Sequence, residues 1–149
     1  SPSGVTLVGT FRVERGHGWL RGLAAAVMGM PAAADSAPIR LTIAPEHDRE
    51  RWTREIGSTR LVSIQWARNG LLHERFGPYR FVYRLTVDDG GLTYTQVAAR
   101  FLGIPVPWPL ALRTSARTRP TADGWEVESV VTAPVLGFLA RYTGPVRPA

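Results

Sequence analysis

The sequence predicts a single soluble domain built mostly from antiparallel β-strands, with one short amphipathic helix near the N-terminus. The chain has 149 residues and is 44% hydrophobic, which suits one domain with one apolar core. Apolar and polar residues alternate in many short segments, and turn-forming residues separate these segments at hairpin spacing. A sheet of about eight to ten strands has to curl or close, because open edges promote aggregation. We therefore expect a strongly curved antiparallel sheet or a closed β-barrel.

The helix is predicted from a change of period close to the N-terminus. Residues 5–14 alternate with the two-residue period of a strand, and Arg15-Gly16-His17-Gly18 interrupts that pattern. Apolar residues then recur at spacings of three and four, as on one face of a helix: Trp19, Leu20, Leu23, Val27 and Met28. Gly29 and Pro31 are expected to end the helix, and residues 32–37 to form a loop. We expect this helix to cover one opening or one face of the sheet.

The rest of the chain is predicted to form strands joined by turns. The predicted strands are residues 39–44, 50–56, 61–68, 71–76, 79–87, 92–101, 110–119, 125–131 and 135–143. Asn69-Gly70 is the strongest hairpin signal, because both residues tolerate a positive φ. A second hairpin is expected at residues 88–91 and a turn at residues 45–48.

Composition argues against a bound metal or cofactor. The chain has no cysteine, and its three histidines include no pair at ligand spacing. It also has no glycine-rich phosphate loop and no nucleophile elbow. Glu46-His47-Asp48 resembles a metal-binding triplet, but three adjacent ligands rarely converge on one ion, so we interpret it as a solvated turn. We therefore expect no metal and no nucleotide cofactor.

The positive charge is distributed along the chain rather than clustered. The formal net charge is +6, and all 18 basic residues are arginines. They form no run and no nucleic-acid-binding motif, which predicts only weak, salt-dependent binding to DNA or RNA without sequence specificity. No apolar segment is long enough for a membrane span, and no signal-peptide pattern is present. We expect a cytoplasmic protein without a membrane span, and we leave a homodimer open.

Two charged residues occupy apolar faces of predicted strands. Arg54 is flanked on its strand face by Trp52 and Ile56, and Glu74 is flanked in the same way by Leu72 and Phe76. A buried charge needs a partner, and one strand separates the two residues, so they can pair. One interpretation is the polar end of a mainly apolar cavity, with Glu74 as a candidate general acid or base. The alternative is a structural ion pair, or faces exposed to solvent.

Further candidates carry similar alternatives. Gln65, Gln96 and Arg100 are polar residues with the same two interpretations. His17 stands between two glycines before the helix, where a ligand can approach the backbone, although a cap or a surface residue is the more common role. The apolar, proline-rich segment 103–109 is the lip of a cavity, a surface for a partner, or a rigid bend.

Several short motifs, taken in order, resemble one bacterial family. They are Phe11-x-Val13-x-Arg15-Gly16-x-Gly18, Gly29-Met30-Pro31, Trp52-x-Arg54-x-Ile56-Gly57, Leu72-x-Glu74-Arg75-x-Gly77, Gly103-Ile104-Pro105-x-Pro107 and Arg141-Tyr142-x-Gly144. In this order they are similar to the family called domain of unknown function 4166, although that family commonly has phenylalanine in place of Ile56. The resemblance implies no established activity; such domains often stand alone or follow an NAD(P)-dependent reductase of the saccharopine-dehydrogenase-like type. It also implies that Arg54 and Glu74 belong to the family's pattern, and we include Trp52 and Tyr142 from these motifs among the candidate binding residues.

Three classes of function fit these observations. The first is a barrel that binds an apolar or lipid-like small molecule. The second is a cofactor-free enzyme, such as a cyclase, isomerase or hydrolase, working inside such a barrel. The third is an accessory domain acting on a partner reductase. A cavity open to solvent would favour the first two classes, and a filled core with an exposed apolar patch would favour the third.

Overall fold

The computed structural model describes residues 4–27 and 29–149, so the predictions for Met28 and for the first three residues lie outside the described part. Its elements are β1 (Val5–Arg15), α1 (Trp19–Val27), β2 (Ala34–Glu46), β3 (Arg49–Ile56), β4 (Thr59–Arg68), β5 (Leu71–Phe76), β6 (Tyr79–Asp88), β7 (Gly91–Phe101), β8 (Ile104–Pro105), the 3₁₀ turn η1 (Trp108–Leu110), β9 (Arg113–Pro120), β10 (Trp125–Ala133) and β11 (Gly137–Pro148). Within these residues, no helix has the length and apolarity needed to cross a membrane.

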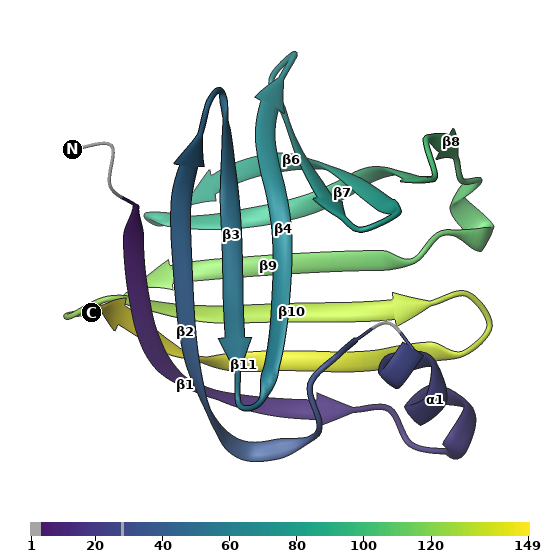
Figure 1. Ribbon diagram of the computed structural model, residues 1–149, viewed down its shortest axis with the longest axis horizontal. Helices are drawn as coiled ribbons and strands as arrows, with labels where there is room; N and C mark the ends of the chain where they lie inside the picture. Colours follow the sequence, from purple (N-terminus) through teal and green to yellow (C-terminus); the bar gives the residue numbers. More distant parts are fainter. Residues whose placement is uncertain (1–3, 28) are drawn as a thin grey trace.

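The strands close into one antiparallel barrel. Their hydrogen-bonded order is β6-β5-β4-β3-β2-β1-β11-β10-β9-β7-β8, and an additional β6–β7 pairing joins the two sides. The two-residue β8 pairs only with the end of β7, so ten of the 11 strands form the ring. In Figure 1, β2 to β4 cross in front of the layer that contains β6, β7, β9, β10 and β11, and β1 bends from the front layer to run beside β11. The predicted mainly-β fold with one helix and a closed barrel is confirmed.

Two of the predicted hairpin turns have the backbone that their residues favour. The φ angles are 53° at Asn69 and 75° at Gly70 between β4 and β5, and 49° at Asp89 and 77° at Gly90 between β6 and β7. Positive φ at both central residues gives a turn whose twist matches that of the flanking strands. These turns fix the register of their strands and therefore decide which side chains face the barrel interior.

The structure corrects the predicted loop at residues 32–37. Residues 34–37 belong to β2, where Ala34 pairs with Val13 and Ala37 pairs with Phe11 of β1. Alanine has little intrinsic preference for strands, so the local sequence does not reveal this part of β2. Pairing with β1, and the burial of Ala37 that accompanies it, place the segment in the sheet.

Other strand boundaries are also shifted. The turn predicted at residues 45–48 is shorter, because β2 and β3 leave only His47 and Asp48 between them. β9 begins at Arg113 rather than at residue 110, since the proline-rich segment before it forms η1. β11 begins two residues later than predicted and runs on to Pro148, where its last residues pair with β1.

The helix is present, but the large apolar side chains in its first half face away from the barrel. Trp19, Leu20 and Leu23 are 76%, 50% and 55% exposed, whereas Ala25 is fully buried. α1 packs beside β11 and β1, and Arg21 donates a hydrogen bond of 2.7 Å from Nε to a backbone carbonyl of the β10–β11 turn. The small alanine side of the helix therefore contacts the barrel, and the larger apolar side remains uncovered.

The barrel interior is mainly apolar. Buried apolar residues come from strands all around the ring: Phe11, Val13, Ile39, Ile56, Phe81, Tyr83, Val131, Leu139, Tyr142 and Val146. Four polar residues are buried with them: Ser63, Gln65, Glu74 and Gln96. Polar groups removed from water have to be hydrogen-bonded, so these four residues mark a candidate functional site inside the barrel.

Candidate functional site

Three neighbouring strands place a polar cluster inside the barrel. Oε2 of Glu74, on β5, accepts hydrogen bonds from Ser63 Oγ at 2.7 Å and from Gln65 Nε2 at 2.7 Å, both on β4. It also accepts one from Nη2 of Arg54, on β3, at 3.2 Å, and Arg54 Nη1 donates to Ser63 Oγ at 3.0 Å. The predicted Arg54–Glu74 pair across one intervening strand is therefore present. We call these four residues the interior polar cluster.

The two oxygens of the Glu74 carboxylate differ in their environment. The side chain of Glu74 is 8% exposed and that of Arg54 is 20% exposed, so the ion pair is reached by solvent from the arginine side. Oε2 already accepts three hydrogen bonds. Oε1 accepts none from the described residues, and it is not among their buried atoms without a partner. Oε1 is therefore available to a hydrogen-bond donor that enters the barrel.

A second network connects β6, β7 and β9 in the same interior. Thr114 Oγ1 donates to Gln96 Oε1 at 3.1 Å, so the hydroxyl of Tyr83 is the donor in its short hydrogen bond to Thr114. Gln96 Nε2 also donates to the carbonyl oxygen of Leu112 at 2.8 Å, and Gln96 Oε1 accepts from the Thr114 amide at 2.7 Å. Gln96, on β7, is therefore hydrogen-bonded to the start of β9, which is a structural role.

Tyr94 and Tyr142 add two hydroxyls that have no partner among the described residues. Burial raises the pKa of Tyr142 to about 12. Burial also raises the pKa of Tyr94, with a further contribution from the charge of Glu74. The Arg54 guanidinium acts in the opposite direction on both pKa values. Tyr142 belongs to the buried apolar core and Tyr94 packs against it. Tyr142, a candidate from the sequence, is thus placed in the same interior as Glu74 and Gln65.

The other candidates from the sequence lie at the margin or outside. The Trp52 ring centroid is 5.2 Å from Cζ of Arg54, and Trp52 Nε1 donates to Glu50 at 3.3 Å, so Trp52 borders the cluster. His17 is exposed on the outer wall before α1. Arg100 is half-buried, and it donates to a carbonyl of the β7–β8 turn at 3.1 Å. Neither His17 nor Arg100 belongs to the interior polar cluster.

The triplet Glu46-His47-Asp48 lies at an exposed turn. His47 has a φ of 60°, and Glu46 is engaged by Arg51, whose Nε donates to Oε2 at 2.8 Å. The three residues are all exposed. Within the described ranges, no group of three or more potential ligand residues is arranged to hold a metal ion.

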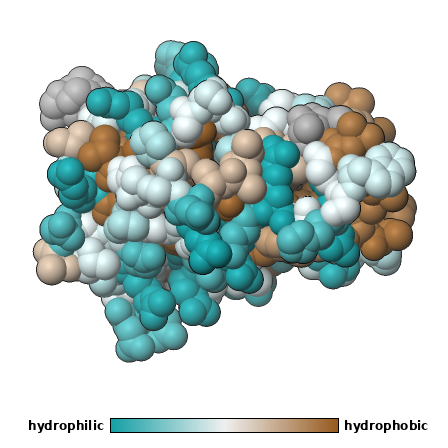
Figure 2. Space-filling model, turned by 90° about the horizontal axis from the view of Figure 1, so that it is seen from below, coloured by the Kyte–Doolittle hydropathy of each residue, from teal (hydrophilic) through white to brown (hydrophobic). Residues whose placement is uncertain are grey.

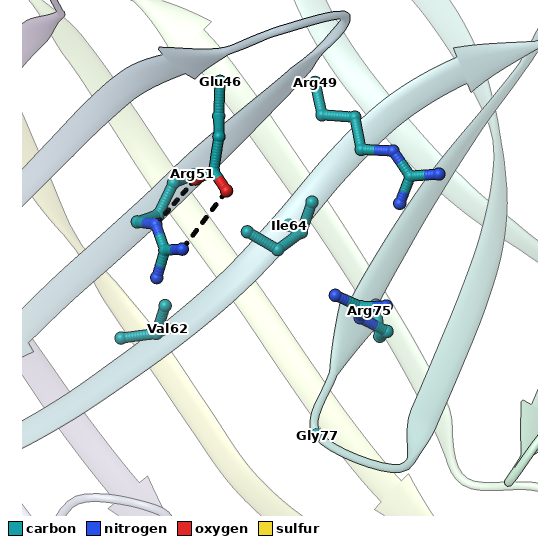
Figure 3. A pocket seen from close by; sticks show the side chains of 7 residues that line it. All are labelled: Glu46, Arg49, Arg51, Val62, Ile64, Arg75 and Gly77. Carbon is teal, nitrogen blue, oxygen red and sulfur yellow. Dashed lines mark hydrogen bonds and ion pairs between the residues drawn. The ribbon is translucent and has the colours of Figure 1, made fainter.

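The two best-defined hollows in the described part of the chain lie on the outer wall. One, of about 470 Å³, is surrounded by arginines on an apolar floor of Val62 and Ile64, as Figure 3 shows. The other, of about 640 Å³, contains His17 beside Phe138. Neither hollow is lined by Arg54 or Glu74, so neither is the cavity expected beside these two residues.

Four polar residues of the interior are absent from the sequence-based candidates: Ser63, Tyr83 and Thr114 of the hydrogen-bonded networks, and Tyr94. Ser63 carried a usable signal, because it lies two residues before Gln65 on the same strand face. Tyr83 and Tyr94 have the pattern of ordinary core residues, and nothing local distinguishes their hydroxyls. Thr114 becomes recognisable only once the pairing of β7 with β9 is known.

Comparison with protein families shows where this barrel belongs. Residues 1–145 match the family described as domain of unknown function (DUF4166). The chain belongs to this family. The matched region includes the motifs around Arg54, Glu74 and Tyr142, so the resemblance that these motifs suggested is confirmed. Comparisons of this DUF4166 domain with curated proteins and with solved structures give no match.

In this DUF4166 domain, three of the four tyrosines are expected to resist ionisation until the barrel unfolds. Burial raises the pKa of Tyr83, Tyr94 and Tyr142 above the value of about 10 for an unfolded chain. The unfolded state therefore releases these protons first, so the free energy of unfolding falls as the pH rises above about 10. Ultraviolet absorbance of tyrosinate, followed with and without denaturant, measures this. Reversible ionisation of all three near pH 10 in the folded protein would contradict it.

Proposed function

We propose that this DUF4166 domain binds a small molecule with an apolar body and a polar head group inside the barrel. The observation that supports the proposal is a set of polar atoms that have no hydrogen-bond partner among the described residues and lie in a mainly apolar interior: Glu74 Oε1 and the hydroxyls of Tyr94 and Tyr142. None of the three is among the fully buried atoms without a partner in the described part of the chain, so water can reach them, and a ligand whose head group replaced that water would complete their hydrogen bonds.

The charges of the interior polar cluster define the kind of head group. Arg54 and Glu74 form an ion pair of zero net charge, so they do not select for a charged ligand. Glu74 Oε1 offers an acceptor, and the two tyrosine hydroxyls offer donors. A neutral group that both donates and accepts, such as an alcohol or an amide, fits this set. The apolar body would pack against the aromatic rings of Phe76 and Phe81, whose centroids are 6.5 Å apart.

Mass spectrometry under non-denaturing conditions tests for such a ligand. The purified protein is expected to carry an additional mass that is released on denaturation and extracted into organic solvent. As an independent probe, 6-propionyl-2-(dimethylamino)naphthalene is neutral and largely apolar, and its carbonyl oxygen can accept hydrogen bonds from tyrosine hydroxyls. Its fluorescence is expected to rise to saturation at one molecule per barrel. No retained molecule together with non-saturable uptake of this probe would contradict the proposal.

Replacing the tyrosines tests where the ligand binds. Tyr142→Phe and Tyr94→Phe remove hydroxyls that hold no hydrogen bond within the described residues, so the fold is expected to remain intact. Each is expected to weaken probe binding by about fivefold, the value of one net hydrogen bond. Glu55→Gln, on the exposed side of β3 next to Arg54, is the matched control and is expected to leave binding unchanged. Equal affinity in all three variants would place the probe elsewhere.

Catalysis inside the barrel is the second candidate function. The observation that favours it is the free Oε1 of Glu74, an acid–base group in the same interior as partner-free tyrosine hydroxyls. Incubating the extracted molecule with fresh protein, and following its mass and isomeric form by chromatography, distinguishes the two functions. Conversion of the molecule would favour an isomerase, cyclase or hydrolase, and an unchanged molecule would favour binding alone.

A further inference from the structure

One end of the barrel exposes apolar side chains from separate segments. α1 contributes Trp19, which is 76% exposed, and Leu23. The chain after β7 contributes Leu102 and Leu110, which are 71% and 68% exposed, and the β10–β11 turn contributes Val135. In Figure 1 these segments gather at the same end of the barrel, and Figure 2 shows hydrophobic residues concentrated there.

Strand pairing confirms that these segments are neighbours. Arg113, which follows η1, lies opposite Thr132 just before the β10–β11 turn. Arg21 of α1 donates to a carbonyl of the same turn. We call this surface the apolar end. Monomeric proteins rarely leave a broad apolar surface of this kind uncovered without a binding role.

The apolar end is positively charged. Its segments, residues 16–34, 99–113 and 134–138, include Arg21, Arg100 and Arg113 and contain no aspartate or glutamate, and Asp35 borders the first segment. Each of these arginines donates to a backbone carbonyl of a loop at this end, and Cζ of Arg113 lies 4.6 Å from the ring centroid of Trp108. The guanidinium groups are therefore held among the exposed apolar side chains.

A row of three arginines leads to this end along the outer wall. Arg75 lies opposite Arg80, Arg80 lies opposite Arg100, and Arg100 pairs with β8. Like charges directly opposite one another destabilise a sheet. Within the described residues, none of the three forms an ion pair, and Nε of Arg80 is buried without a partner. Burial, followed by the charge of Arg80, lowers the pKa of neighbouring His73.

We propose that the apolar end docks on the surface of an anionic phospholipid bilayer. Exposed tryptophan and leucine side chains suit the boundary between head groups and acyl chains, and surrounding arginines attract the negative head groups. A bilayer also offers an extended flat surface that can meet α1 and the β8–η1 segment at once. This inference stands independently of the ligand proposed for the interior, because it rests on a different surface.

Charge argues against a second copy of the chain as the occupant. Two apolar ends facing each other would bring six arginines together, three from each copy, with no carboxylate from the segments named above. Repulsion between these groups would oppose such a dimer, whereas an anionic surface neutralises them.

Vesicle co-sedimentation tests the proposal. The protein is expected to bind vesicles of phosphatidylcholine and phosphatidylglycerol in equal parts at least about tenfold more tightly than vesicles of phosphatidylcholine alone. High sodium chloride is expected to weaken this binding, and tryptophan fluorescence is expected to shift to shorter wavelength on binding. Equal binding to both kinds of vesicle, or binding to neither, would overturn the proposal.

Variants at the two ends of the barrel distinguish binding through the apolar end from non-specific adsorption to vesicles. Leu23→Ser is expected to weaken binding to the mixed vesicles severalfold. Arg80→Gln is expected to weaken this binding about fivefold, and it also removes repulsion between neighbouring arginines in the folded sheet. Val87→Ser and Arg147→Gln make comparable exchanges at exposed positions of the opposite end and are expected to have no effect. Sedimentation velocity of the same proteins detects the alternative occupant. Self-association that Leu23→Ser abolishes, without vesicle binding, would overturn the proposal in favour of a homodimer.

Discussion

Replacing Glu74 by glutamine is expected to lower the free energy of unfolding by about 3 kcal/mol, at the lower end of the range for breaking a buried ion pair. Glutamine has the shape of glutamate, so Ser63 and Gln65 can still donate to its side-chain oxygen. Arg54, which is only 20% exposed, then keeps its charge without a counter-charge. Chemical denaturation of both proteins at neutral pH measures the difference.

A second variant identifies the cause of this loss. Arg54→Met combined with Glu74→Gln removes the unpaired charge while leaving the amide for Ser63 and Gln65. This double variant is expected to be more stable than Glu74→Gln alone, because the lone buried charge carries most of the cost. Glu55→Gln, at an exposed position of the same strand as Arg54, is the control and is expected to change stability by less than about 0.5 kcal/mol. A double variant no more stable than Glu74→Gln would contradict this account.

The interior polar cluster could be predicted because it depends on local rules. Hairpins connect β3, β4 and β5, so chain order determines which strands are neighbours. The two-residue period determines which face each side chain takes, and it placed Arg54, Gln65 and Glu74 on one side. The same reasoning could have included Ser63. The proximity of Arg54 and Glu74 follows from the hairpin order and the two-residue period, and it requires no knowledge of contacts between distant segments.

The parts that could not be predicted depend on contacts between distant segments. Tyr142 meets the interior because β11 pairs with β1 at the other end of the chain, and no local pattern indicates that pairing. Thr114 enters its network through the β7–β9 pairing, and the register shift between Val82 and Tyr83 alters the alternation of β6. The uncovered face of α1 has a similar cause. Periodicity predicts an apolar stripe on Trp19 and Leu23, but it does not say what covers the stripe.

The pairing of the first and last strands also sets a limit on side-chain size. Gly144, on β11, lies where a Cβ atom would be 2.0 Å from the carbonyl oxygen of Thr10 and 2.9 Å from Cδ1 of Phe11. Phe11 is 6% exposed and belongs to the core, so its ring uses the space that the missing side chain leaves. Gly9, on β1, meets the same constraint from the other side, with Pro145 O at 1.9 Å from its notional Cβ.

Gly144→Ala is therefore expected to lower the free energy of unfolding by about 3 kcal/mol or more, because the backbones of β1 and β11 must move apart to admit one methyl group. Gly9→Ala is expected to have an effect in the same direction. Gly22→Ala makes the same exchange in α1, where no heavy atom of the described residues, apart from the chain neighbours and the helix's own backbone, lies within 4 Å of the new Cβ. It is expected to leave stability unchanged or to raise it by up to about 1 kcal/mol, since alanine is the better helix former. Thermal and chemical denaturation of the three variants measure these differences. Equal stability of Gly144→Ala and Gly22→Ala would contradict the close approach of the two terminal strands.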